Sequence, residues 1–189
     1  MADKAREIVV NTALEDTKNN QNITSLREAI NEANKDTTSE KIYINFRKEG
    51  AVGAKSWHIK PNSPLPAIAH KNIYFNYNIP KNVTIDGTNL SKKGGRTYSL
   101  LTVGNYANIK SSEPGPKAHF KHINLVNNTA TAEHGSNGGG GGLAAGAGMS
   151  ILHGDVVLEN IVFQNLKAVG GAESIAPVSY THLTLPTKA

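Results

Sequence analysis

The side chains able to carry acid–base chemistry are few in this sequence and widely spaced. Of 189 residues, five are aspartates, at positions 3, 16, 36, 86 and 155. Asp155 and Glu159 fall four apart in a strand-like run, so both side chains leave the same face of that strand. Enzymes that cleave polysaccharides pair carboxylates for general acid and base work, but two carboxylates on a solvated strand face are more often plain surface. The sequence therefore identifies no catalytic residue.

Metal chemistry has equally little support in the sequence. His119 and His122 are three apart, and on a strand this spacing points the two rings to opposite faces. A metal ion needs three or four converging ligands, so a shared site at these histidines is not expected. His134 and His153 fall in expected loops, with no carboxylate or nucleophile partner beside them. We predict no metal site.

A glycine tract, NGGGGGLAAGAGMS at 137–150, formally contains the cofactor motif G-x-G-x-x-A at Gly140, Gly142 and Ala145. A dinucleotide site needs a strand directly before this motif and an amphipathic helix directly after it. The residues that follow, GMSILHGDVVLEN, are typical of strands instead. We therefore predict a glycine-rich loop over 137–148 and no cofactor.

The elements that must position these side chains are short strands. Between residues 41 and 170, runs of alternating apolar and polar residues are bounded by Gly, Pro, Asn or Ser, which is the pattern of strands and turns. No long helical pattern alternates with them, so a sheet of strand–helix–strand units is not expected. The runs are KIYINF, SWHIK, NIYFNYNI, NVTIDG, SLLTVG, FKHINLV, MSILHG and DVVLENIVF.

Part of this pattern repeats. Five positions recur further along the chain at one constant offset, and a shorter match precedes them at a slightly larger offset. A repeat of this size predicts stacked coils, in which equivalent side chains lie above one another. The matched positions are Phe120, Ile123, Leu125, Asn127 and Ala130 with Leu158, Ile161, Phe163, Asn165 and Ala168, and Val83, Ile85 and Gly87 with Ile123, Leu125 and Asn127.

The repeat makes two structural predictions. The side chains of both pairs, Ile123 with Ile161 and Leu125 with Phe163, should point inward on parallel strands of one stack. The asparagines that follow these strands should form a buried ladder of amides at a turn, because Asn tolerates a left-handed backbone and each amide can bond the next.

One segment, TSLREAINEANK at 24–35, is typical of a helix instead. Its apolar residues Leu26, Ala29, Ile30 and Ala33 share one helical face. Ser25, with Glu28 three residues on, forms a capping box. A solenoid exposes an apolar end at its first coil, so we predict that a helix over about 25–34 caps that end.

These residues resemble a known family. TSLREAINEAN, with IVVNTALED before it and KIYINF after it, resembles the start of bacterial right-handed parallel β-helix proteins that carry the CSLREA motif. SPLPAI and NVTIDGTN resemble the opening coils of the same family, whereas Thr24 stands where the motif has cysteine. The resemblance spans about residues 7–171. It implies a large secreted or outer-surface protein of the polymorphic outer-membrane or autotransporter-passenger type.

Composition narrows the classes of partner. The net charge is +5, from 20 basic and 15 acidic residues that are scattered rather than clustered, and no nucleic-acid motif accompanies them. There is no cysteine, hence no disulfide framework, and no apolar run long enough to span a membrane. The start, MADKAREIVVNT, lacks the apolar core of a signal peptide. Either the protein is cytoplasmic, or it is a fragment of an extracellular or outer-membrane surface protein whose export signal lies upstream.

The last twelve residues, VSYTHLTLPTKA at 178–189, differ in style from the rest and resemble translated adapter sequence. We expect a non-native tail there, and in residues 1–177 the cap and first coils of a longer β-helix.

Three functions fit this sequence. The favoured one is a non-enzymatic surface or secreted passenger, an adhesion or interaction scaffold whose partner is a cell-surface protein or a polysaccharide. The second is a truncated polysaccharide lyase or glycoside hydrolase with its catalytic coils further along, and the third is a structural spacer.

Overall fold

The structure is a computed structural model that describes residues 4–14, 24–46, 57–78, 82–91, 98–105, 114–135 and 142–173. Short strands make up most of its regular structure, together with one ten-residue helix and one single-turn helix. The elements are β1 (Ala5–Val10), α1 (Leu26–Lys35), β2 (Lys41–Phe46), β3 (Trp57–Ile59), β4 (Asn72–Phe75), β5 (Val83–Asp86), α2 (Thr88–Ser91), β6 (Leu101–Val103), β7 (Lys117–Lys121), β8 (Ile123–Thr131), β9 (Met149–Ile151), β10 (Asp155–Glu159) and β11 (Val162–Val169).

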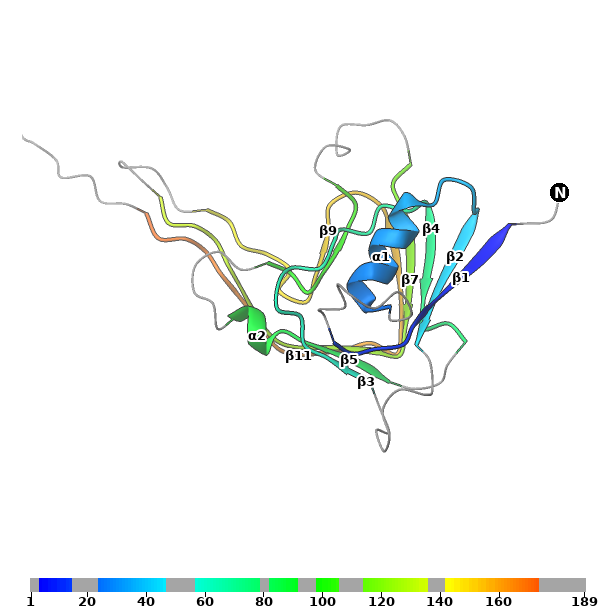
Figure 1. The fold of residues 1–189 in the computed structure, drawn as a ribbon. Helices are drawn as coiled ribbons and strands as arrows, with labels where there is room; N and C mark the ends of the chain where they lie inside the picture. Colours follow the sequence, from blue (N-terminus) through cyan, green and yellow to red (C-terminus); the bar gives the residue numbers. More distant parts are fainter. Residues whose placement is uncertain are drawn as a thin grey trace, which may run out of the picture.

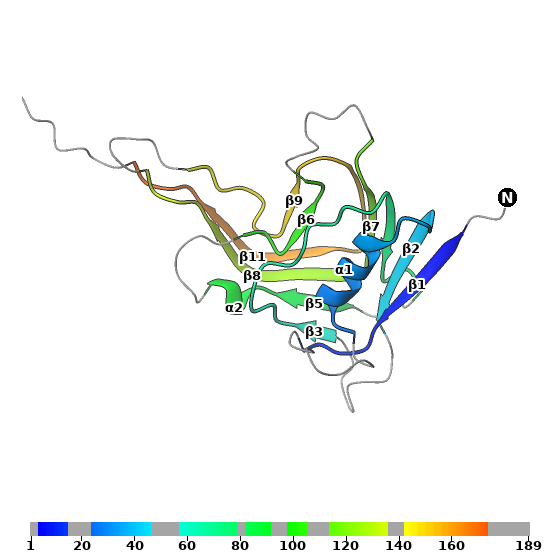
Figure 2. The same ribbon diagram turned by 45° about the horizontal axis from the view of Figure 1, so that its top comes forward.

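The strands form three parallel sheets, and the chain visits them in rotation (Figures 1 and 2). Sheet A has the order β1-β2-β4-β7-β10, sheet B the order β11-β8-β5-β3, and sheet C pairs β6 with β9. Successive coils run β4-β5-β6, then β7-β8-β9, then β10-β11. Every described strand pair is parallel. The expected parallel β-helix is confirmed.

The strand register follows the sequence repeats residue for residue. On sheet B, Ile85 pairs with Leu125 and Leu125 pairs with Phe163, which are the same matches that the sequence repeat predicts. A register slip of one residue would turn every inward side chain outward. The apolar pattern therefore fixes the register although the loops between the strands differ in length.

The inward side chains form one core along the solenoid axis. Ile123 and Leu125 are fully buried, as predicted, and the rings of Phe75 and Phe120 stack with centroids 4.7 Å apart. Phe163 occupies the expected register position but remains 49% exposed. It belongs to β11, which ends sheet B, and no described strand covers the next position.

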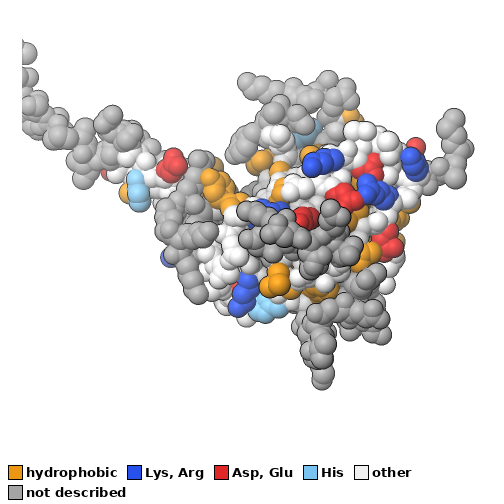
Figure 3. Space-filling model, in the orientation of Figure 1, with side chains coloured by type: hydrophobic (Ala, Val, Ile, Leu, Met, Phe, Trp, Pro, Cys, Tyr) orange, Lys and Arg blue, Asp and Glu red, His pale blue; other side chains and the backbone are white. Residues whose placement is uncertain are grey.

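Helix α1 closes the other end of this core. Leu26, Ala29, Ile30 and Ala33 are buried together with the inward residues of β1 and β2. The capping box is present, since Ser25 accepts a bond from the Glu28 N–H and the Glu28 carboxylate accepts one from the Ser25 N–H. Figure 3 shows acidic and basic side chains interspersed over the end of the solenoid that α1 covers. The predicted cap is confirmed, with bounds of Leu26–Lys35.

Polar contacts attach the cap to the first coils. The Asn34 side chain bonds backbone groups much as a neighbouring strand would. Its amide nitrogen donates to Ala67 O at 2.7 Å, and its amide oxygen accepts from Ala69 N at 2.9 Å. On the same helix, Arg27 donates to the carbonyl oxygens of Ser63 and Pro64. These bonds satisfy backbone groups of the chain that runs past the helix.

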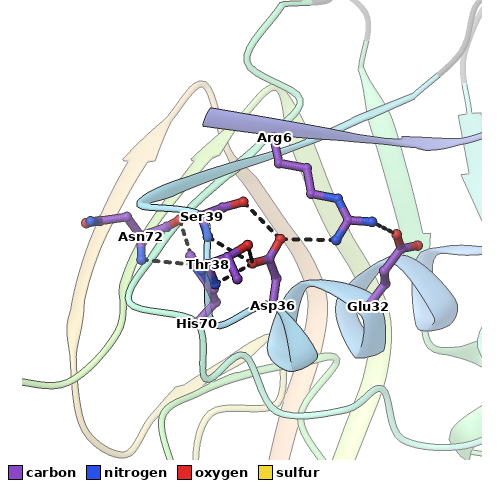
Figure 4. A network of polar contacts seen from close by, with 7 residues as sticks. All are labelled: Arg6, Glu32, Asp36, Thr38, Ser39, His70 and Asn72. Atoms are coloured by element: carbon purple, nitrogen blue, oxygen red, sulfur yellow. Dashed lines mark hydrogen bonds and ion pairs between the residues drawn. The ribbon is translucent and has the colours of Figure 1, made fainter. Parts of the chain in front are cut away.

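A second network starts at Asp36, the residue that ends α1 (Figure 4). Its carboxylate accepts bonds from the backbone N–H groups of Ser39 and Thr38, and from Arg6 on β1, which also contacts Glu32. These donors, with Ser39 and Thr38 first, hold the pKa of Asp36 well below its usual range. The ionised carboxylate thus connects the helix, the turn after it and the first strand.

Left-handed residues make the corners of the coils. Single residues with positive φ, His122 and Asn160, turn the chain from sheet A into sheet B between β7 and β8 and between β10 and β11. Asn127 and Asn165, with φ of 56° and 52°, bend β8 and β11 at matching positions. Asparagine adopts this conformation more readily than most residues, which accounts for its frequency at these corners.

The predicted asparagine ladder exists, but it lies nearer the surface than expected. Asn165 Nδ2 donates to Asn127 Oδ1 at 3.0 Å, and Asn127 Nδ2 donates to Asp86 Oδ1 at 3.2 Å. Asn127 is half-buried and Asn165 exposed. The prediction of a buried ladder was wrong, since Asn165 lies on β11, the edge strand of sheet B, where no described strand covers it.

The glycine-rich loop and the non-native tail were also predicted from the sequence. Residues 142–148 of the predicted loop carry no helix or strand, whereas its residues 137–141 lie outside the described residues. The segment 178–189 lies outside the described residues. Among the helices that the structure does describe, none has the length and apolar character needed to cross a membrane.

Replacing Leu26 by Asp should lower the free energy of unfolding by more than about 3 kcal/mol, because it removes a buried apolar side chain and leaves a carboxylate among apolar groups. Urea denaturation followed by circular dichroism measures this change. Asn31→Asp, at an exposed position of the same helix, should change stability by no more than about 0.5 kcal/mol. Equal losses in both variants would contradict the capping role.

Asn127→Ala should destabilise the protein more than Asn127→Gly does. Both variants lose the amide bonds to Asp86 and Asn165, but only Ala must hold a left-handed backbone, at about 1–2 kcal/mol. Denaturation midpoints of the two variants give the difference directly. An alanine variant as stable as the glycine variant would show that the corner does not constrain this backbone.

Candidate functional site

The outer face of sheet A carries a row of rings. Strand alternation turns Tyr43 of β2, Tyr74 of β4 and His119 of β7 outward, between inward residues that are buried. The register places Tyr43 beside Tyr74 and Tyr74 beside His119 on successive coils. A single row of aromatic side chains therefore runs along the solenoid axis.

These rings contact one another closely. Tyr43 and Tyr74 stack with centroids 5.0 Å apart, and Tyr74 and His119 stack at 4.5 Å. Tyr77, which follows the left-handed corner at Asn76, packs its ring against Tyr43 at 5.8 Å and against Tyr74 edge-on at 5.6 Å. We call Tyr43, Tyr74, Tyr77 and His119 the aromatic row. Tyr77 is 47% exposed, whereas the other three members are half-buried.

Charged groups of both signs border the aromatic row. Lys121 places its ammonium 5.4 Å from the Tyr77 ring centroid and 3.2 Å from a Glu159 carboxylate oxygen. At the other end of the row, Asn45 Nδ2 donates to Glu7 Oε1 at 2.6 Å. The described outer face of sheet A thus combines ring edges and phenol groups with paired charges, and carries no strong field of one sign.

This arrangement suits contact with an extended partner. Aromatic rings supply apolar area at low conformational cost, and phenol groups add hydrogen bonds at the edge of that area. The neighbouring stacked rings hold each side chain in place before a partner arrives. The row repeats at the spacing of the coils, so a polymer lying along the axis meets equivalent groups at regular intervals.

A second polar cluster surrounds Asp86 on the outer side of sheet B. Asp86 Oδ2 lies 2.9 Å from His58 Nε2 and 3.8 Å from Lys60 Nζ, and Asp86 Oδ1 accepts bonds from Thr88 and Asn127. The Asp86 side chain is 5% exposed, whereas that of His58 is 52% exposed. The ion pair and hydrogen bonds occupy both oxygens of the carboxylate, so this cluster stabilises the corner of the coil.

Opposing effects set the pKa of Asp86. Burial raises it, but bonds donated by the Thr88 hydroxyl and N–H, by His58 and by Asn127 outweigh burial and hold the pKa well below its usual range. The carboxylate is therefore ionised in the folded protein at neutral pH.

The residues considered for catalysis do not come together. Asp155 and Glu159 lie exposed at the two ends of β10, and Glu159 pairs with Lys121. His119 joins the aromatic row, whereas His122 forms a left-handed corner. His134 accepts a bond from the Ala172 N–H at 2.8 Å. Within the described ranges, no three His, Asp or Glu side chains gather closely enough to hold a metal ion.

The sequence carries a signal for the aromatic row that lies outside the constant-offset repeat. Tyr43 and Tyr74 sit at the same alternating position of KIYINF and NIYF, and His119 takes that position in the next coil. The two intervals between these rings differ from each other, and neither equals the offset that relates Phe120 to Leu158. The row becomes visible only when strand alternation is compared between coils of unequal length.

Comparison with protein-family models, with curated proteins and with solved structures finds no match to this chain.

Stability should fall as the solution is acidified, in the pH range where aspartate titrates. The folded pKa of Asp36 and of Asp86 lies below the unfolded value, so their stabilising effect is complete above the unfolded pKa of about 4 and is lost progressively below it. Urea midpoints measured from neutral pH down into the acid range test this.

The Asp86→Asn variant should be less stable than the wild type at neutral pH and should lose less stability on acidification. Asp155→Asn, a change at an exposed carboxylate, is the matched control and should follow the wild-type curve. An Asp86→Asn curve parallel to that of the wild type would contradict the assignment of this pH dependence to Asp86.

Proposed function

We propose that this chain is an interaction scaffold, the cap and first coils of a surface-displayed or secreted β-helix passenger that binds through the outer face of sheet A. The aromatic row is the observation that carries the proposal. It is a partly exposed set of stacked rings on the outside of a fold whose apolar core is built from other side chains.

The physical reason lies in where these rings are placed. An outward position on a β-helix needs no aromatic residue for folding, because inward side chains such as Ile73 and Phe75 supply the buried area. Here three successive coils place a ring at the same outward position, and a fourth ring, Tyr77 from the turn after β4, packs against two of them. Exposed aromatic groups with polar edges are enriched at binding surfaces.

The proposed partner is a cell-surface polysaccharide. A sugar ring offers C–H faces that pack on aromatic groups and hydroxyls that bond phenols, amides and carboxylates. A partner of high charge density gains little from a face whose charges balance, which favours a chain of low charge. The outward Asp, Glu and Lys side chains on the described part of sheet A balance in formal charge, three acidic and three basic: Glu7, Lys41, Lys117, Lys121, Asp155 and Glu159.

A location outside the cell follows from this proposal, since cell-surface polysaccharide is accessible there. Under this proposal the inward and the outward side chains of sheet A have different roles. The inward residues fix the coils, and the outward residues of sheet A are left to make contacts.

Tyr77→Ala should weaken retention by soluble polysaccharide in affinity electrophoresis by about tenfold, because it removes an exposed ring from the contact face. A panel of neutral glucans, mannans and xylans, with pectin as an acidic comparison, provides the probes. Tyr77→Phe keeps the ring and should retain most of the binding, which separates stacking from the hydroxyl contribution.

Thermal unfolding of both variants shows whether the fold is kept, as expected for a half-exposed side chain. Unchanged retention of every bound polysaccharide after Tyr77→Ala, or retention of none by the wild-type chain, would overturn the proposal.

A further inference from the structure

A cleft lies on a different part of the molecule, outside sheet C. It encloses about 850 Å³, which is within the usual range of about 300–1,000 Å³ for ligand sites. Three parts of the chain form its walls: the residues leading into β6, the end of β8 with the residues after it, and the segment from Gly142 to Leu152 that includes β9. Figure 2 shows β6 and β9 side by side, with the chain continuing β8 away from the body of the solenoid.

Hydroxyl groups dominate the polar lining of this cleft. Ser99 and Ser150 contact each other through their hydroxyls across sheet C, and Thr102 lies beside Ser150 in the strand register. Tyr98 stands at the cleft with 46% of its surface exposed. The hydroxyl-bearing lining residues are Tyr98, Ser99, Thr102, Thr131 and Ser150.

The charge of the lining narrows the choice of ligand. Glu133 is the one ionisable acid among the described lining residues, and none of them is a lysine, arginine or histidine. A phosphate or a uronic acid would therefore bring negative charge to a wall that offers no cation and already holds a carboxylate. The polar groups present are those that exchange hydrogen bonds with an uncharged polyol.

The lining of the cleft also has an apolar part. Leu143, Met149 and Ile151 contribute aliphatic surface to the same lining as Tyr98. A pyranose presents one face of C–H groups and a rim of hydroxyls, which matches an aromatic and aliphatic wall next to a row of serine and threonine hydroxyls.

Glycine at position 146 lets the backbone pass close to the strand that carries Ser150. Gly146 has φ of 65°, and an added Cβ there would collide with Met149 O and lie 2.7 Å from Ser150 Oγ. A side chain at this position would therefore displace the strand that carries Ser150. The small residue keeps the hydroxyl at the cleft surface.

From these observations we infer that the cleft is a binding site for a short neutral oligosaccharide, with Tyr98 stacking on a sugar face and Thr102 and Ser150 bonding its hydroxyls. This site shares no residue with the aromatic row, so it does not depend on the function proposed for sheet A.

Isothermal titration calorimetry with neutral hexasaccharides of glucose, mannose and xylose, and with hexagalacturonate as the acidic counterpart, tests the inference. We expect binding of at least one neutral hexasaccharide and none of the acidic one. Tyr98→Ala should weaken that binding about tenfold through the lost stacking surface, whereas Tyr98→Phe should weaken it by no more than about threefold.

Backbone amide shifts of the wild-type protein provide a second measurement that needs no variant. On titration with the neutral sugar they should change at residues 98–102, 130–133 and 142–152. Binding unaffected by Tyr98→Ala in a folded variant, shifts confined to sheet A, equal binding of hexagalacturonate, or binding of no neutral hexasaccharide would each overturn the inference.

Discussion

Backbone pairing between one coil and the next determines where every side chain of this protein's coils points. Each strand of sheets A and B uses its N–H and C=O groups to hold the neighbouring coil in parallel register, so equivalent residues stand above one another. Two consequences follow. Inward positions must be apolar on every coil, which gives the stack that includes Phe75 and Phe120, and outward positions become rows, which gives the aromatic row.

A stack of this kind needs special residues where it turns and where it begins. Left-handed residues such as His122 and Asn160 let one strand follow another across a short corner, so both strands keep their pairing. Strand β1 is the edge strand of sheet A among the described residues, so no described coil covers the core on that side. Helix α1 covers it with an apolar stripe, and Asn34 and Asp36 bond the polar groups that a strand would otherwise have satisfied.

Much of this architecture could be predicted from the sequence because it depends on local patterns and on one clear repeat. The capping box at Ser25, the apolar stripe of α1, and the matches between Ile85, Leu125 and Phe163 all rest on spacing within or between short segments. The candidate sites were harder to predict. The aromatic row joins coils of unequal length, and the pair of His58 and Asp86 forms between segments with no common motif. A repeat also gives the direction of a side chain but not what covers it, so the position of Phe163 was predicted correctly while its exposure was not foreseen.

Outward residues of successive coils stand side by side, and thiol cross-linking tests this arrangement directly. The chain has no cysteine, so the pair Thr84→Cys and Asn124→Cys places two unique thiols at register partners on the outer face of sheet B. A short bis-thiol reagent should link this pair within one chain much faster than it links Thr84→Cys with Thr129→Cys, which lies further along β8 and out of register with position 84. Equal rates for the two pairs, or faster linking of the second, would contradict the parallel register between successive coils.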